Sequence, residues 1–166
     1  MKTCLKEAYD LIGDKTPLKS DCGEWCGAAC CGTDADGQGG VWLYPGEAEN
    51  LSGAEWAEIR EREAGTILLC KGMCERGTRP FGCRIFPLAP VKRADGSWTV
   101  RIDARAKAVC PLANSGLKGL DSAFVRAAAK AVARLAEDGT FEEILLKRQG
   151  EEDDFREEVN GFLGKS

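Results

Sequence analysis

Nine cysteines and the absence of histidine in 166 residues constrain most strongly what this chain can fold into. Without histidine, the chain cannot form a Ser-His-Asp triad or an HExxH zinc site. It also cannot form an iron site made of two histidines and a carboxylate. Any bound metal must therefore be held mainly by cysteine thiolates, with carboxylates as a lesser alternative.

The charge of the chain and its first residues restrict its partners and its compartment. The formal net charge of −4 disfavours broad binding to nucleic acid or to an acidic membrane, so we expect neither partner. The first twenty residues contain seven charged side chains and no apolar run typical of a signal peptide. We therefore expect a cytoplasmic protein, where clustered cysteines indicate metal or redox chemistry rather than disulfides.

The cysteines are grouped in a way that core packing does not explain. Four of them fall within the ten residues 22–31, and two more repeat a four-residue step. Cys4 stands apart on an expected helix, where a cysteine usually packs as a small buried hydrophobe. The candidate metal ligands are the other eight: Cys22, Cys26, Cys30, Cys31, Cys70, Cys74, Cys83 and Cys110.

Their spacing restricts which thiolates can share an ion. Helical residues four apart lie about 6 Å apart along the axis and can meet at one ion, but residues eight apart, at about 12 Å, cannot. Cys22 and Cys30 can thus share a metal only if the segment is irregular, as Gly23 and Gly27 suggest. Adjacent cysteines point in different directions. The pattern predicts either two sites, or one site and a buried thiol.

Hydrophobic periodicity and capping motifs predict a mixed set of elements. We expect helices over 3–12, 122–138, 141–147 and 151–162. A Ser-x-x-Glu capping box at Ser52 predicts another helix over 52–64. Residues 66–70 are typical of a buried strand, and 84–93 with 98–103 of a β-hairpin.

These elements indicate the α+β class and one domain over residues 1–166. Residues 20–112 form the predicted metal-stabilised, cysteine-rich region of loops and short strands, with flanking helices. Residues 120–166 form the predicted helical C-terminal region, which contains no cysteine.

A motif in the second half of the cysteine-rich region is similar to a known family. Residues 79–87 read Arg-Pro-Phe-Gly-Cys-Arg-Ile-Phe-Pro, and a cysteine run ending in Cys30-Cys31 precedes them. This pairing resembles the CxxCxxCC cysteine-cluster domain family, described as zinc- or iron-chelating. The early run is one residue longer in each gap than that motif, and the resemblance covers residues 20–112. A related domain occurs in flagellin lysine-N-methylases, where an iron–sulfur cluster is suspected. This chain has no Gly-rich nucleotide loop, so we do not predict a methylase.

Basic residues near Cys83 are candidates for stabilising thiolates. Arg79 and Arg84 flank this cysteine, and a nearby cation lowers the pKa of a thiol. Four thiolates around Zn²⁺ leave a charge of −2, which guanidinium groups would offset. Lys71 and Arg76 are either further cations of this kind or surface charges.

The function that we expect is metal binding. The chain is interpreted as a cytoplasmic protein that holds zinc or an iron–sulfur cluster through cysteine thiolates, with redox chemistry or electron transfer as one role. The alternative is a structural zinc-binding interaction module without catalysis. A thiol oxidoreductase is disfavoured because no CxxC pair is present. Whether the protein is an enzyme, and which protein it contacts, stay open. Trp25 and Phe81 are interpreted as local packing rather than as a shield for the site.

Overall fold

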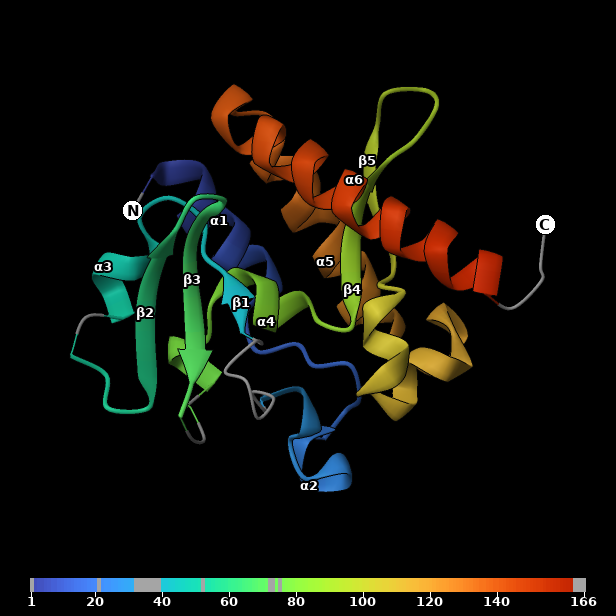
Figure 1. Ribbon diagram of the computed structural model, residues 1–166, viewed down its shortest axis with the longest axis horizontal. Coiled ribbons are helices and arrows are strands. Elements are labelled where there is room, and N and C mark those ends of the chain that lie inside the picture. The colour runs from blue at the N-terminus through green and yellow to red at the C-terminus, as the bar shows by residue number, and fades with distance from the viewer. Residues whose placement is uncertain are drawn as a thin grey trace.

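The computed structural model describes residues 2–20, 22–31, 40–51, 53–71, 74 and 76–162. It contains helices and two antiparallel sheets, and its C-terminal part is helical, so the predicted α+β class is confirmed. Figure 1 shows the three-stranded sheet on one side of the molecule and a two-stranded hairpin on the other. None of the helices in the described ranges combines the length and the apolar character needed to span a bilayer.

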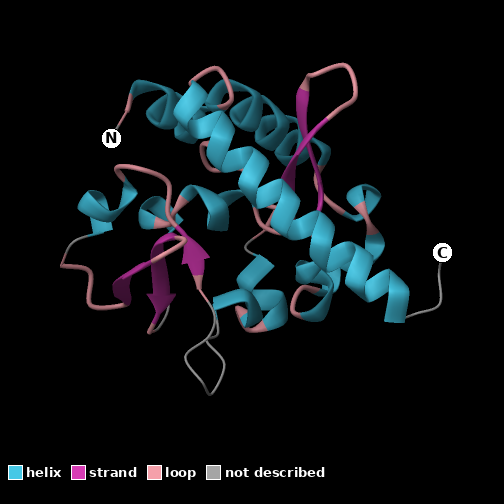
Figure 2. Ribbon diagram, turned by 45° about the horizontal axis from the view of Figure 1, so that its top comes forward, coloured by secondary structure: helices cyan, strands magenta, loops and turns pink. Residues whose placement is uncertain are grey.

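The main core is built by three long helices and the hairpin. Helices α1 (Thr3–Ile12) and α5 (Ser122–Leu135) pack against each other, and α5 also packs on strand β5 (Trp98–Ile102). Helix α6 (Gly139–Phe162) crosses strand β4 (Leu88–Lys92), as Figures 1 and 2 show. The largest fully buried apolar side chains of this core are Leu5, Ile12, Phe81, Phe124, Val132, Leu135, Phe141 and Leu145.

The second sheet has a much smaller core. Its strand order is β1-β3-β2, with β1 at Val41–Trp42, β3 at Gly65–Cys70 and β2 at Ala57–Arg62. Helix α3 (Glu47–Leu51) follows β1 along the chain. Among the described residues, only Leu43, Leu51 and Leu68 are buried in this second cluster.

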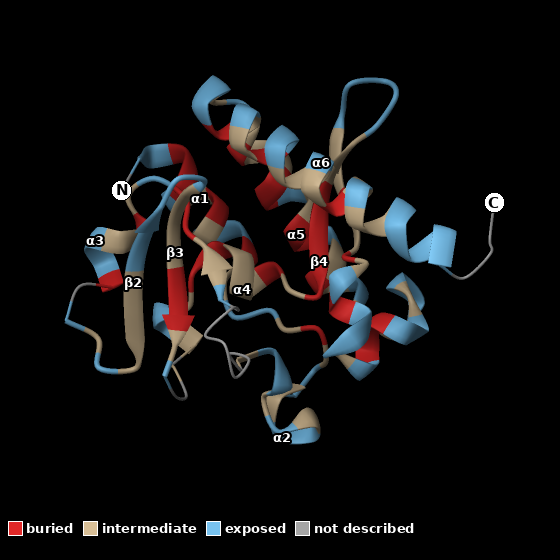
Figure 3. Ribbon diagram, viewed as in Figure 1, coloured by how far each residue is buried: buried red, intermediate tan, exposed pale blue. Residues whose placement is uncertain are grey.

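The early cysteine run forms a short helix and a turn rather than a regular helix. Helix α2 (Cys22–Cys26) ends at Gly27, and the chain turns through Gly27 and Ala28 with φ values of 62° and 53°. A 3₁₀ turn, η1 (Ala29–Cys31), follows. Neither element contains a buried residue, as the pale and tan ribbon of α2 in Figure 3 indicates. The predicted irregularity is confirmed.

Short helical segments connect the two sheets. The turn η2 (Arg76–Thr78) leads into helix α4 (Phe81–Ile85), which lies between β1 and α1. After β5, three 3₁₀ turns lead the chain to α5: η3 (Arg105–Ala108), η4 (Pro111–Ser115) and η5 (Leu117–Gly119).

The predicted helix over 52–64 is wrong, because residues 57–62 form strand β2. This strand pairs with β3 along its whole length, from Ala57 opposite Cys70 to Arg62 opposite Gly65. Ladder hydrogen bonds to a buried neighbouring strand outweigh a capping motif, since intrinsic helix propensities are small. Ser52, which carried the capping motif, lies outside the described residues.

The predicted hairpin is correct in its second arm and begins too early in its first. Residues 81–85 form α4 instead, and strand β4 starts at Leu88. The pairing of Leu88 with Ile102 and of Lys92 with Trp98 matches the predicted turn between the arms.

The two predicted C-terminal helices are one continuous helix, α6. The side chain of Asp138 caps its start by accepting a hydrogen bond from the Thr140 amide at 3.0 Å. Further along, the fully buried Glu152 accepts a hydrogen bond from the Ala104 amide at 2.8 Å and pairs with Arg156 at 2.6 Å. Packing of this carboxylate against the hairpin stabilises the helix beyond Gly150, so the break that the sequence predicts at Gly150 is absent and the helix is continuous.

Candidate metal centre

A cavity of about 140 Å³ lies where the end of β3, helix α4 and the turn η1 meet, and we call it cavity A. Its walls bring together cysteines from two stretches that are far apart in the sequence, the turn η1 and residues 70–83. Those cysteines are Cys30, Cys31, Cys70, Cys74 and Cys83. No cysteine forms a disulfide. The fold thus gathers five of the eight predicted ligands around one space.

Strand β3 and helix α4 position two of these thiols. Cys70 is the last residue of β3, opposite Ala57 of β2. Helix α4 packs closely on β1, since a Cβ at Gly82 would lie only 2.7 Å from a methyl carbon of Val41. Glycine at this position therefore lets α4 approach the sheet and carry Cys83 into cavity A.

A buried carboxylate that the sequence does not reveal fixes the start of α4. Glu47 accepts hydrogen bonds from the amides of Tyr44 and Phe81, each at 2.7 Å, and from the Tyr9 hydroxyl. It supplies the acceptor that is otherwise missing, since Pro80 at the helix start has no capping side chain. Burial raises the pKa of Glu47 in spite of these hydrogen bonds. Nothing in its polar sequence neighbourhood distinguishes Glu47 from a surface residue.

The thiols in cavity A are close enough to hydrogen-bond. The Cys74 thiol donates to Cys31, which raises the pKa of Cys74. The Cys31 thiol in turn donates to Cys30, which raises the pKa of Cys31 and lowers that of Cys30. Cys31 therefore links two segments that lie more than forty residues apart.

Burial and mutual repulsion disfavour ionisation of the other two thiols. Burial raises the pKa of Cys70 to about 11, and negative charge on Cys31 and Cys74 adds to the effect. Burial also raises the pKa of Cys83, with further repulsion from Cys70 and Cys31. Several thiolates can therefore share this space only when a cation balances them. The donor set fits a thiophilic metal on this chemical ground.

The two arginines of the motif have different roles. Arg79 lines cavity A, and its hydrogen bond to Cys74 opposes part of the rise in the pKa of that thiol, which the hydrogen bond to Cys31 and burial cause. Arg84 turns away, with its guanidinium 4.5 Å from the centre of the Tyr9 ring. It donates to the carbonyl oxygens of Arg79 at 3.1 Å and Gly77 at 2.6 Å. Arg84 thus holds the loop that carries Arg79, and only Arg79 is the predicted cation beside the thiols.

The remaining predicted neighbours lie away from the thiols or pack as expected. Lys71 is a surface charge, with a side chain 59% exposed and paired with Glu58. Arg76 donates to the carbonyl oxygen of Lys15. Phe81 is fully buried in the main core, as local packing predicts.

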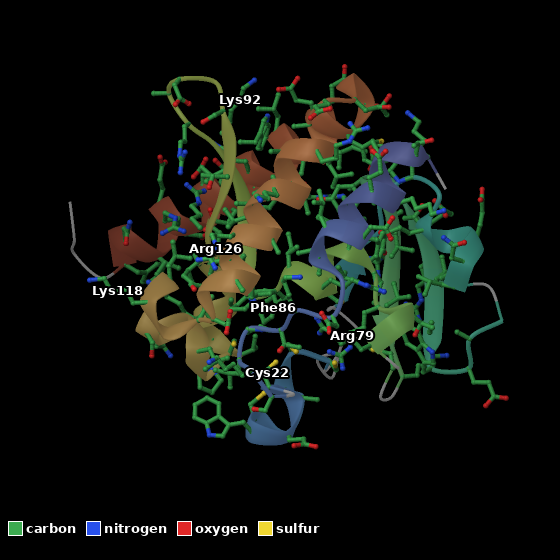
Figure 4. All side chains as sticks on the ribbon, turned by 180° about the vertical axis from the view of Figure 1, so that it is seen from behind. Cys22, Arg79, Phe86, Lys92, Lys118 and Arg126 are labelled. Carbon is green, nitrogen blue, oxygen red and sulfur yellow. The ribbon has the colours of Figure 1, made fainter. Side chains whose placement is uncertain are left out.

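A second, narrower cavity of about 20 Å³ lies beside α2, and we call it cavity B. Its cysteines are Cys22, Cys26, Cys30 and Cys110. Phe86 lines both cavities, and Figure 4 shows it above Cys22, with Arg79 nearby, at the end of the molecule where sulfur atoms gather. All eight predicted ligands thus line one of two adjoining cavities.

Cys4 lies away from both cavities. It is 6% exposed in the main core, with its Sγ 4.0 Å from Asp138 Oδ2. Its predicted place in the hydrophobic core is confirmed.

Two aromatic residues border the cavities. Trp56 lines cavity A. Trp25 lines cavity B, and its side chain is 63% exposed.

Within the part of the chain that the structure describes, no group of three or more cysteine, aspartate or glutamate side chains has the arrangement of a metal site. The thiols line shared walls, and binding an ion would require them to turn toward a common point. No protein-family model matches the chain, and neither a curated protein nor a solved structure matches it. The resemblance carried by residues 79–87 therefore stays a prediction, and the case for a site depends on its own residues.

Proposed function

We propose that this chain is a cytoplasmic metal-binding protein whose cysteine thiolates hold an inorganic centre in cavity A. The observation that carries the proposal is the meeting of five cysteines from two distant stretches, residues 30–31 and 70–83, around one space. Core packing alone gives no reason for such a meeting, because thiols would then be distributed like other small apolar side chains. Soft thiolate ligands select zinc, copper(I) and iron–sulfur clusters over hard cations.

The proposed ligands are Cys31, Cys70, Cys74 and Cys83. Cys31 is hydrogen-bonded to Cys74, and repulsion from Cys31 and Cys74 acts on both Cys70 and Cys83. Arg79 would offset part of the negative charge of four thiolates and donate to a ligand sulfur. Hydrogen bonds of this kind also tune the reduction potential of iron–sulfur clusters.

The size of cavity A favours an iron–sulfur cluster over a single ion. A volume of about 140 Å³ is several times the roughly 10–15 Å³ of cavity volume that one water needs. A cubane cluster of four irons and four sulfides needs such space, whereas one zinc needs only bonds of about 2.3 Å to each sulfur. The chemistry that a cluster would supply is electron transfer, with Cys30, which is exposed, marking the side open to solvent.

A structural zinc site is the second candidate, and the small core under the three-stranded sheet favours it. Only three described residues are buried there, so this sheet has little hydrophobic stabilisation of its own. Small folds with small cores commonly depend on a metal or disulfides. In this case the centre would stabilise a surface for a protein partner and would carry no electrons.

Metal analysis of protein purified without oxygen tests the proposal. We expect iron with acid-labile sulfide and visible absorption near 400 nm that bleaches on reduction; one zinc per chain without that absorption would instead establish the second candidate. Cys83→Ser should lose the bound metal, while the matched variant Cys4→Ser should keep it. Metal-free parent protein, or Cys83→Ser with unchanged metal content, would overturn the proposal.

A further inference from the structure

We infer that cavity B is a separate site for a single thiophilic metal ion, such as Zn²⁺, bound by Cys22, Cys26, Cys30 and Cys110. This inference rests on the proposed function, in which thiolates of the same region hold metal, and it adds a second centre of a different size. The argument depends on the composition of cavity B, on its volume and on the packing of α2.

Among the residues that the structure describes, sulfur atoms are the only side-chain metal donors that line cavity B. Apart from the four cysteines, its described walls are apolar and include Trp25, Phe86 and Val109. Four thiols match the coordination number of a closed structural zinc site. An apolar wall without carboxylates gives no binding surface to a hard cation such as Ca²⁺ or Mg²⁺.

The backbone delivers the four thiols from two directions. Cys22 and Cys26 lie four residues apart on the single turn of α2, where the Cys26 thiol donates to the Cys22 carbonyl oxygen at 3.4 Å. The left-handed turn at Gly27 and Ala28 then reverses the chain toward Cys30. Cys110 comes from a distant part of the chain, between η3 and η4.

The position of Cys110 is set by the backbone on both sides. Its amide donates to the carbonyl oxygen of Ala106 at 2.7 Å, and Pro111 begins the next turn. Cys110 is therefore held in place, whereas α2 is the part that would move to close the site.

Packing of α2 explains why an ion is needed there. Neither α2 nor η1 contains a buried residue, and a five-residue helix is not stable on its own. Cys22 is only partly buried against the main core, so hydrophobic burial holds this segment weakly. An ion shared by α2 and Cys110 would add a further link between this segment and the core.

The two cavities divide the adjacent pair of cysteines between them. Cys31 lines only cavity A, while Cys30 lines both and lies close enough to Cys22 and Cys26 for their charges to interact. Assigning Cys31 to cavity A and Cys30 to cavity B gives each cavity four thiolates. The volume of about 20 Å³ in cavity B admits one ion or one water and excludes a cluster.

Metal stoichiometry in matched cysteine variants tests this inference. Protein purified without oxygen is dialysed against Zn²⁺, and bound metals are measured per chain. The parent should hold the centre of cavity A and one additional zinc. Cys22→Ser and Cys110→Ser should each lose that one zinc and keep the other centre, while Cys70→Ser should lose the centre of cavity A and keep the zinc.

The outcomes separate this inference from the proposed function. If the parent holds one centre that Cys70→Ser abolishes and Cys110→Ser leaves intact, cavity B is not a site, while the proposed function stands. If Cys110→Ser and Cys70→Ser each remove all metal, one shared centre replaces the two. A metal-free parent would contradict both proposals.

Tryptophan fluorescence gives a readout that does not depend on the folding of cysteine variants. Trp25 lines cavity B, so Co²⁺ bound there should quench its emission. The difference in emission between the parent and Trp25→Phe should fall as one equivalent of Co²⁺ binds, and excess Zn²⁺ should restore it. A difference that Co²⁺ leaves unchanged would overturn the assignment of an ion to cavity B.

Discussion

The main core and the cysteine-lined end of the molecule are stabilised by different means. The main core buries nineteen described residues from α1, α4, α5, α6, the hairpin and their connections, including several fully buried aromatic rings. The second core buries three leucines, and the residues of α2 and η1 are at most partly buried. Figure 3 shows this contrast between the red interior near α5 and β4 and the pale α2.

This difference indicates which region of the molecule a metal centre would stabilise most. Hydrophobic burial contributes about 25 cal/mol for each Å² of apolar surface removed from water, so it stabilises the main core more than the cysteine-lined end. At the cysteine-lined end, the thiols line cavities that apolar side chains do not fill. We therefore expect metal to determine the stability of one region and hydrophobic packing that of the other.

Metal removal should have the largest effect, and it should be regional. Structural zinc can contribute about 10–16 kcal/mol of apparent folding free energy in small domains. Chelation under reducing conditions should expose the amides of β3 and α2 to rapid hydrogen exchange, while those of α5 stay protected. Equal loss of protection in α5 would contradict the comparison, because the two regions would then share one source of stability.

A cavity created by mutation in the main core should have the opposite effect: it should destabilise the main core and leave the bound metal in place. Phe124 is fully buried, so Phe124→Ala should lower the free energy of unfolding by about 3–5 kcal/mol. Denaturant unfolding measures this change, and metal per folded chain should equal that of the parent. Loss of metal from the folded variant would show that the core and the cysteine-lined end are coupled.

Glu47 joins the two regions, and its replacement should have an intermediate effect. In Glu47→Gln, an amide N–H group would face a donor at Tyr44 or Phe81, which costs about 1–3 kcal/mol. Thermal unfolding at neutral pH measures the loss. Tyr9→Phe removes only one of the three donors and serves as the milder control.

The pH dependence of stability gives a second readout for Glu47. Burial raises its folded-state pKa above the ordinary value of 4.5, although the nearby Arg84 opposes the shift. Between these two pKa values the folded protein binds more protons than the unfolded chain, so stability falls as pH rises through that window. Glu47→Gln should lack this contribution. If Glu47→Gln and the parent show the same dependence of stability on pH, Glu47 does not titrate between these two pKa values.

Trp25→Ala should have the smallest effect. Its side chain is 63% exposed and belongs to neither core, so the free energy of unfolding should change by less than about 0.5 kcal/mol. Denaturant unfolding of metal-free protein makes this comparison. A larger loss would mean that α2 is held by packing rather than by thiolates.

Sequence periodicity predicted the elements whose burial follows from local pattern. The helix over 3–12 has the bounds of α1, and the strand over 66–70 lies within β3, because their apolar residues repeat with the periods of helix and strand. The spacing of the cysteines likewise singled out the eight thiols that line the two cavities and separated them from Cys4.

Other features depended on partners distant in the chain. Residues 57–62 became a strand because β3 offered a full ladder, and α6 continued past Gly150 because the hairpin accommodates Glu152. No local pattern encodes such partners, because the free energy comes from contacts formed only after the chain has folded.

The sequence by itself determined the class of fold and the chemistry available to the chain, since the absence of histidine and the crowding of cysteines hold in any conformation. Only the tertiary structure decided how the thiols are grouped, which arginine lies beside them, and that the buried Glu47 supports α4. The physical reason is that grouping, burial and charge compensation are properties of distances through space. Spacing along the chain limits those distances without setting them.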